Sequence, residues 1–177
     1  MLKINQRSMM RLRLLSLPIF IFILFACATI PTKTYEETVL EWKSYKDVAK
    51  WMDRYFTYDM ARLKETEGRW PSPRSPEETF KLRSGVCHDA SFFEKETLNR
   101  INPSYEAKMV FIENRPYDVN HFVCSFEAEG KLYIMDYGTY YRNMVGVHGP
   151  YNSLDEYKKF YERYHPKVRH VQSIRYW

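Results

Sequence analysis

The sequence predicts an α+β domain in which N-terminal helices pack on an antiparallel β-sheet. Two observations lead to this class. Apolar residues recur at helical spacing after residue 36, whereas runs rich in β-branched and aromatic residues follow from residue 107 onward. Short turns separate these later runs, and helices followed by hairpin-linked strands are typical of an α+β domain.

The first 26 residues are expected to be an export signal outside this fold. Four basic residues and no acidic one precede an apolar run, Leu14–Ala26, that stops at Cys27. The run is shorter than the roughly 20 residues that a spanning helix needs. Leu24-Phe25-Ala26-Cys27 resembles the lipobox of bacterial lipoproteins, which implies lipidation of Cys27. Ordinary secretion with a free thiol is the alternative.

Residues 27–36 are expected to tether a domain of residues 37–177 to the cell envelope. Ala28 does not resemble the aspartate that retains lipoproteins at the inner membrane, so we expect the outer membrane where the cell has one. Of the 27 basic residues, four lie in the signal, which leaves 23 against 22 acidic residues. Because this balance provides no basic surface for phosphates, we expect no nucleic-acid partner.

Capping and breaking residues delimit the expected helices. Apolar spacing predicts one or two helices up to about residue 56, and a proline-rich loop follows at residues 68–76. Ser75 as N-cap and Pro76 at the first position predict a short helix through Leu82. A longer helix is predicted over residues 86–101, so Cys87 would lie in its first turn.

The second half is expected to form the sheet and one more helix. Strands are predicted in a row at residues 108–113, 120–128 and 131–137. Glu129-Gly130 is the expected turn between the last two. A capping box at Ser153 predicts a helix through about Tyr164, and a final strand is predicted over residues 168–176.

The predicted hairpin brings two polar residues together. A loop of two or four residues would set Asp136 opposite Val123, so that His121 and Asp136 share one face as diagonal neighbours, about 7–8 Å apart. At that separation a carboxylate can orient an imidazole. A loop of three residues would reverse the parity and separate the pair.

Cys87 completes a candidate catalytic group. Unpaired amides and the helix dipole at a first turn favour a thiolate. If that turn packs against the hairpin, Cys87, His121 and Asp136 become nucleophile, base and orienting acid, the arrangement that acyl transfer needs. Taken one at a time, Cys87 could be a buried small residue, His121 a core histidine and Asp136 a cap at the end of a strand. Their order and spacing taken together favour catalysis.

A zinc site is the competing interpretation, because Cys87, His88, His121 and Cys124 are residue types that bind this metal. His121 and Cys124 are three residues apart on a predicted strand, so their side chains should project to opposite faces. We therefore expect neither a metal nor a cofactor.

Three segments carry a resemblance to a known family. Residues 84–90 (SGVCHDA), 120–123 (NHFV) and 132–137 (LYIMDY) resemble the transglutaminase-like superfamily, and the resemblance extends over residues 48–138. It implies a papain-type fold with Cys87 as nucleophile, His121 as general base and acid, and Asp136 as its orienting partner. For the oxyanion donor, the Cys87 amide, Trp51 and Tyr58 are candidates.

The expected function is that of an extracytoplasmic cysteine hydrolase or acyltransferase. It would act on an amide or peptide bond of a peptide or protein through a Cys87 thioester, with peptidase, amidase and cross-linking activities all open. The proline-rich loop and the connection of residues 138–150 are expected to flank the cleft. The alternative is a catalytically silent envelope module that binds peptide or glycan through a groove of tyrosines: Tyr105, Tyr117, Tyr133, Tyr137, Tyr140 and Tyr141.

Overall fold

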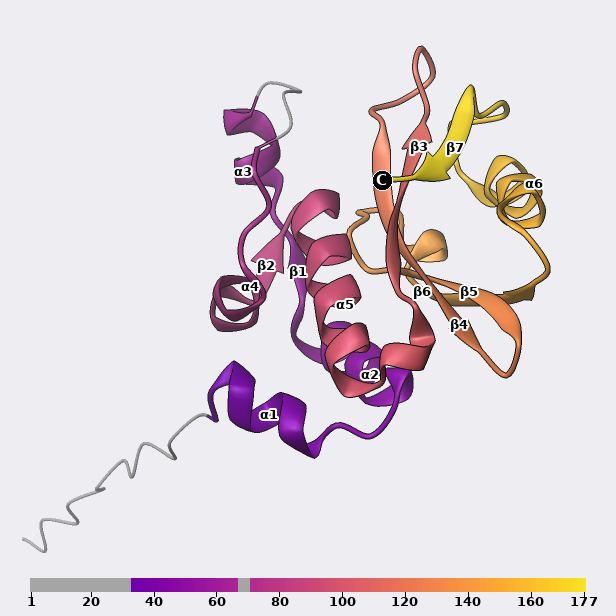
Figure 1. Ribbon diagram of the computed structural model, residues 1–177. Helices are drawn as coiled ribbons and strands as arrows, with labels where there is room; N and C mark the ends of the chain where they lie inside the picture. Colours follow the sequence, from indigo (N-terminus) through magenta and orange to yellow (C-terminus); the bar gives the residue numbers. More distant parts are fainter. Residues whose placement is uncertain (1–32, 67–70) are drawn as a thin grey trace, which may run out of the picture. The chain divides into compact units, whose positions relative to one another are not determined.

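A computed structural model describes residues 33–66 and 71–177 (Figure 1). The expected signal, Cys27 and most of the expected tether lie outside these residues and remain predictions. The elements of the described part are, in chain order, α1 (Tyr35–Glu41), α2 (Tyr45–Tyr55), β1 (Thr57–Tyr58), α3 (Met60–Glu65), α4 (Pro76–Leu82), β2 (Ser84–Gly85), α5 (Cys87–Ile101), η1 (Pro103–Tyr105), β3 (Lys108–Glu113), β4 (His121–Ala128), β5 (Lys131–Asp136), η2 (Arg142–Met144), β6 (Gly146–Tyr151), α6 (Leu154–Tyr164) and β7 (Ser173–Tyr176).

The main sheet is antiparallel and five-stranded in the described part of the chain, with the strand order β6-β5-β4-β3-β7. In the β4–β5 hairpin, Ala128 pairs with Lys131 and Cys124 with Met135. The turn has two residues. This register confirms the prediction that His121 and Asp136 project to the same face of the hairpin. A separate short parallel pair, β1 and β2, joins the segment before α3 to the segment before α5.

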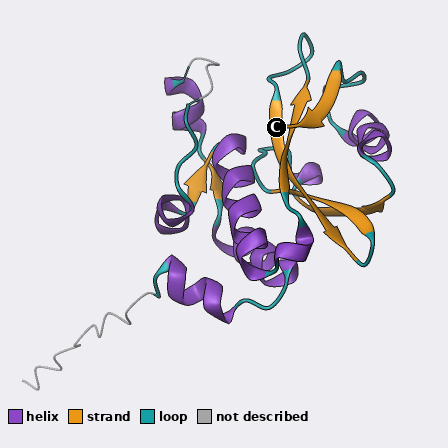
Figure 2. Ribbon diagram, in the orientation of Figure 1, coloured by secondary structure: helices purple, strands orange, loops and turns teal. Residues whose placement is uncertain are grey.

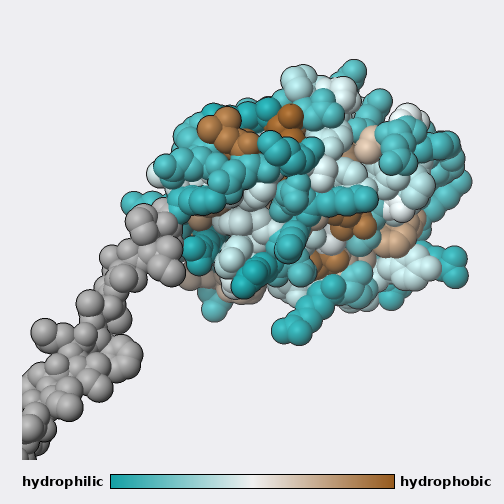
Figure 3. Space-filling view, turned by 90° about the horizontal axis from the view of Figure 1, so that it is seen from below, coloured by the Kyte–Doolittle hydropathy of each residue, from teal (hydrophilic) through white to brown (hydrophobic). Residues whose placement is uncertain are grey.

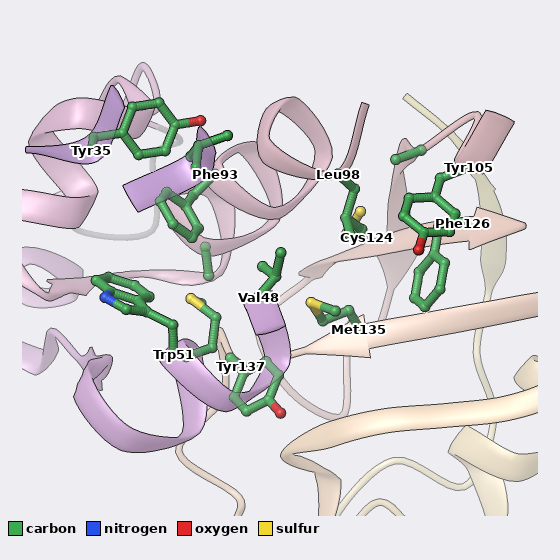
Figure 4. Packing of buried hydrophobic residues seen from close by; sticks show 14 residues of the cluster. Tyr35, Val48, Trp51, Phe93, Leu98, Tyr105, Cys124, Phe126, Met135 and Tyr137 are labelled. Carbon is green, nitrogen blue, oxygen red and sulfur yellow. The ribbon is translucent and has the colours of Figure 1, made fainter. Parts of the chain in front are cut away.

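Helices cover both faces of the sheet (Figures 1 and 2). On one face α5 packs with Phe93 and Leu98 against Cys124, Phe126 and Met135, together with α1 and α2 (Figure 4). On the other face, Tyr157 and Tyr161 of α6 pack against a second set of strand residues: Val110, Ile112, Val123 and Ile134. The predicted α+β class, with helices on an antiparallel sheet, is confirmed.

The domain begins earlier than expected. Thr34 caps α1 through a capping box with Glu37, so the helix starts at Tyr35, within the tether expected to run to residue 36. Tyr35 is 4% exposed and packs against Phe80 and Phe93. Its ring belongs to the core, so a tether can extend only to the residues before Thr34.

Several predicted boundaries were wrong in the C-terminal half. The connection of residues 138–150 contains most of β6, whose Gly146, Gly149 and Pro150 weaken any local strand signal. The last strand starts at Ser173 instead of residue 168, because Val168 and Val171 are buried against α6 in irregular backbone. The helix α3 and the β1–β2 pair were not predicted.

The described surface carries apolar residues in small, separate groups on the face shown in Figure 3, which is otherwise mostly hydrophilic. Among residues 33–66 and 71–177, none of the helices has both the length and the apolar character required to cross a membrane.

Candidate active site

Cys87 is the first residue of α5, and several contacts fix that end of the helix. Asp89 is fully buried, and its Oδ2 accepts the N–H of Val86 at 2.9 Å. The Arg62 side chain donates to both oxygens of this carboxylate, and the backbone N–H of Arg74 donates to Oδ1 at 2.8 Å. The first turn of α5 is therefore tied to the two segments that precede it, which fixes the position of the Cys87 backbone.

Two glycines allow close backbone approach to this turn. A Cβ at Gly85 would lie 2.6 Å from the Cβ of Asp89, and a Cβ at Gly138 would lie 2.5 Å from the Cα of Cys87. Carbon atoms do not approach each other this closely, so a side chain at either position would force the backbone to move. Because Gly138 has no side chain, the chain after β5 can lie directly against Cys87.

His121 and Asp136 meet at the ends of the hairpin strands. The Nε2 of His121 lies 2.9 Å from Oδ2 of Asp136, and both side chains are buried. Because a carboxylate accepts, Nε2–H of His121 donates to Asp136, and Cys87 is close enough to influence the charge of the same ring. The structure thus brings the three predicted residues together, and their catalytic roles remain predictions.

Neighbouring charges decide the protonation state of His121. Burial opposes protonation, but the charge of Asp136, its hydrogen bond and then the contact with Cys87 outweigh burial and hold the pKa of His121 well above its ordinary range. The ring is therefore an imidazolium at neutral pH. The ring can therefore donate a proton to a group held beside the sulfur.

Residues of α6 and its C-terminal end support the His121 ring. Tyr161 lies nearly parallel to that ring with a centroid separation of 6.3 Å, and its hydroxyl accepts a hydrogen bond from Asn114. His165 stacks on Tyr161, and its Nδ1 accepts two backbone N–H groups. Burial and then the charge of His121 lower the pKa of His165 to about 4, so this second ring is neutral at physiological pH.

A pocket opens onto Cys87 and His121. It is open to solvent, and residues from both halves of the described chain line it. Pro71 of the proline-rich loop and residues 138–141 line it, as expected for segments that flank the cleft. Tyr58, beside α3, lines the pocket as well.

The candidates for oxyanion donor separate clearly. Trp51 stacks on Phe80 at 4.9 Å within the hydrophobic core and does not line the pocket, so this candidate is wrong. Tyr58 lines the pocket, and burial followed by the proximity of Cys87 raises the pKa of its phenol. Its hydroxyl therefore keeps its proton and can donate. The Cys87 amide, at the helix start, remains the second candidate.

The expected tyrosine groove exists only in part. Tyr140 and Tyr141 line the pocket. Tyr105, Tyr133 and Tyr137 instead pack in the core on the α5 side of the sheet. Tyr117 is exposed in the β3–β4 loop, and it does not line the pocket.

The residues of the alternative zinc site point in different directions. His88 donates from Nδ1 to the Pro71 carbonyl oxygen at 2.9 Å and stacks on Phe122. Cys124 packs among core residues on the α5 side, whereas His121 stacks on α6. Their projection to opposite faces is confirmed. Among the described residues, no group of His, Cys, Asp and Glu side chains is arranged to hold a metal ion.

Some residues that shape the site were not singled out from the sequence. Asp89 had a local signal, because a carboxylate three residues after a helix N-cap often caps that helix. Gly138, Asn114 and Tyr161 act through contacts between residues distant in sequence, and no periodic pattern marks such contacts.

Comparison with known proteins gives a family assignment through one family model. The model of a family described as a transglutaminase-like domain matches residues 29–159, well over half of the chain. A solved structure described as a TGase is similar with a TM-score of 0.39 and 11% identity, over 71% of this chain and 32% of that one. The chain thus spans about a third of that structure. No curated protein matches the sequence.

The extent of the family match, together with the α+β architecture, leads to one conclusion: the chain belongs to the family of transglutaminase-like domains.

Proposed function

We propose that this protein is a cysteine hydrolase or acyltransferase that acts on an amide or peptide bond through a thioester on Cys87. The observation that supports this function best is the His121–Asp136 hydrogen bond next to Cys87, with Cys87 and His121 both lining one pocket. A thiol at a helix start can attack a carbonyl carbon, and a buried imidazolium next to it can supply the proton that the leaving group needs. Charged groups held in this way are typical of catalytic sites.

The reaction would proceed in two steps. The Cys87 thiolate attacks the carbonyl carbon of the amide, forming a carbon–sulfur bond, and His121 gives its proton to the leaving nitrogen as the carbon–nitrogen bond breaks. Water or a second amine then loses a proton to His121, attacks the thioester and releases the Cys87 thiolate. Asp136 orients the ring and stabilises its protonated form in both steps.

Tyr58 is the side chain that we propose for stabilising the oxyanion. It lines the same pocket as the thiol, and its hydroxyl remains protonated because burial and the nearby thiol oppose ionisation. The backbone N–H of Cys87 would supply the second donor. Two such donors stabilise the negative charge that develops on the carbonyl oxygen in the transition state.

The first test is the pH dependence of Cys87 alkylation by iodoacetamide in the full-length protein. The modified Cys87 peptide, quantified by mass spectrometry, separates this thiol from Cys27 and Cys124. We expect rapid labelling well below the ordinary thiol pKa of about 8.5, lost in His121→Ala. Labelling with an ordinary thiol profile that His121→Ala leaves unchanged would contradict the mechanism, and so would unchanged turnover of a true substrate by Cys87→Ala.

A silent binding module is the second candidate. It is favoured by the aromatic walls that Tyr58, Tyr140 and Tyr141 give the pocket, and by the low exposure of Cys87, which is 4%. Aromatic walls can stack against peptide or glycan without chemistry. Unreactive Cys87 together with retained binding of peptide or glycan would establish this function in place of catalysis.

We also propose that the domain works outside the cytoplasm, held at the envelope by a lipid on Cys27. The proposal rests on the basic and apolar order of residues 1–26 and on the resemblance to a lipobox. Incorporation of an alkyne-labelled fatty acid in growing cells should require Cys27. If Cys27→Ser incorporates as much label as the wild type, the anchor lies elsewhere.

A further inference from the structure

Three buried residues that interact electrostatically with one another have side-chain oxygens without a hydrogen-bond partner among the described residues. These oxygens are Oδ1 of Asp136, the hydroxyl of Tyr157 and both carboxyl oxygens of Glu94. The residues come from three different elements, β5, α6 and α5. Since unpartnered buried polar groups are uncommon, three in mutual electrostatic contact at one candidate site require an explanation.

Glu94 lies on the same face of α5 as Cys87. The two residues are seven apart, so they are separated by about two helical turns. Glu94 is 1% exposed, and neither carboxyl oxygen has a hydrogen bond of good geometry, although the Tyr137 backbone N–H is close enough to favour the anion slightly. The mechanism proposed above uses none of its atoms.

Two buried carboxyl groups close to each other do not both ionise readily. Asp136 has the His121 imidazolium at 2.9 Å to stabilise its charge. Glu94 has no hydrogen-bonded cation among the described residues, and burial followed by the charge of Asp136 raises its pKa well above the ordinary range. The charge of His121 acts in the opposite direction on the pKa of Glu94, but its effect is smaller than those of burial and Asp136. The remaining groups that interact with Glu94 are Tyr137, Tyr157 and Cys124, and burial raises the pKa of each, which keeps them uncharged.

We propose that Glu94 is a positioning residue that stays protonated, so that Asp136 is the one charged carboxylate that acts on His121. This inference rests on the proposed function. The neutral acid keeps a polar group in the buried region around Asp136, and it adds no further negative charge to the one that His121 and Cys87 already share. The state of Glu94 thereby sets the pH range in which the Asp136–His121 pair operates.

Two variants separate charge from polarity. Glu94→Gln keeps a neutral polar group of the same shape, and Glu94→Leu keeps only the bulk. Glu96→Gln, on an exposed part of the same helix, is the matched control. All are made in the full-length chain and compared with the wild type in urea unfolding and in the pH profile of Cys87 alkylation.

Urea unfolding reports the proton on Glu94 independently of catalysis. A carboxyl whose pKa is raised in the folded state contributes stability that is fully present below its unfolded pKa and is lost as pH rises toward the folded value. Glu94→Gln has no such loss. We therefore expect its stability relative to the wild type to increase steadily from pH 5 to pH 8, whereas the difference for Glu96→Gln stays flat. A flat difference for Glu94→Gln would mean that Glu94 is ionised in the folded protein, and would overturn the proposal.

Alkylation of Cys87 reports the positioning role. We expect Glu94→Gln to label within about twofold of the wild type, and Glu94→Leu to label about tenfold more slowly near pH 6, because Asp136 then holds the imidazolium less well. Wild-type rates in Glu94→Leu, or an altered His121-dependent profile in Glu94→Gln, would refute it. An unactivated Cys87 in the wild type would instead refute the proposed function, and unfolding would still report the state of Glu94.

Discussion

The helix α5 carries two buried acidic residues whose surroundings are opposite. Asp89 in the first turn accepts hydrogen bonds from Val86, Arg74 and the guanidinium of Arg62. Glu94 has no hydrogen bond of good geometry to either oxygen. Both side chains are almost inaccessible to solvent.

The hydrogen-bond donors around these two carboxyl groups differ, and the difference gives the two ends of this stretch of α5 separate roles. A buried carboxylate whose oxygens all have donors is stable as an anion and fixes the backbone around it. A buried carboxyl without donors favours the protonated form, and its charge can respond to pH and to neighbours. The Asp89 cluster therefore holds Cys87 in place, whereas in the region around Glu94 and Asp136 the Asp136 carboxylate raises the pKa of His121.

Asp136→Asn should have the largest effect on reactivity. We expect Cys87 labelling near pH 6 to fall about 10²–10⁴-fold, because the amide neither stabilises the imidazolium nor fixes its tautomer. The His121 pKa, followed by NMR of the imidazole, should drop steeply, because burial then opposes protonation without a carboxylate to offset it. Asp118→Asn, in the pocket wall, is the control. An unchanged His121 pKa would show that Asp136 does not control this charge.

Gly138→Ala tests the contact between the chain after β5 and the start of α5, where the Asp89 cluster meets the region around Asp136. The new Cβ would lie 2.5 Å from Cα of Cys87, so the chain after β5 must move away from α5. A displacement of this kind should reduce labelling or turnover about 10²-fold. Gly130→Asn, in the open β4–β5 turn, is the control because nothing lies within 4 Å of a Cβ there. Equal rates in both variants would argue against the close approach.

Asp89→Asn should affect stability more than chemistry. Removal of the buried anion leaves Arg62 without its partner, and we expect urea unfolding at pH 7 to show a loss of about 3 kcal/mol. The His121 pKa should not move in the protein that remains folded. If Asp89→Asn instead shifted this pKa as Asp136→Asn does, the division between the two regions would be wrong.

Tyr58→Phe should have the smallest effect. Iodoacetamide labelling of Cys87 should be unchanged, because alkylation develops no oxyanion. Turnover of an amide substrate should fall about tenfold through kcat, since the donor acts in the transition state. Tyr140→Phe, in the same pocket wall, is the control. A rise in KM with an unchanged kcat would assign Tyr58 to substrate binding instead.

Local patterns in the sequence determined a large part of this site. The two-residue turn at Glu129-Gly130 defines the β4–β5 register, and that register alone places His121 beside Asp136. The helix start at residue 87 is likewise marked by short-range signals. Such features depend on residues close together in the chain, so periodicity and turn chemistry are sufficient to predict them.

The tertiary structure alone decided what surrounds these residues. The core position of Trp51, the approach of Gly138 to Cys87 and the burial of Glu94 beside Asp136 depend on how α5 packs against β4 and β5. Contacts of this kind join segments tens of residues apart and leave no periodic signal in either segment. The sequence by itself therefore determined which groups could react, whereas packing decided their charges, their access to the pocket and the neighbours that hold them.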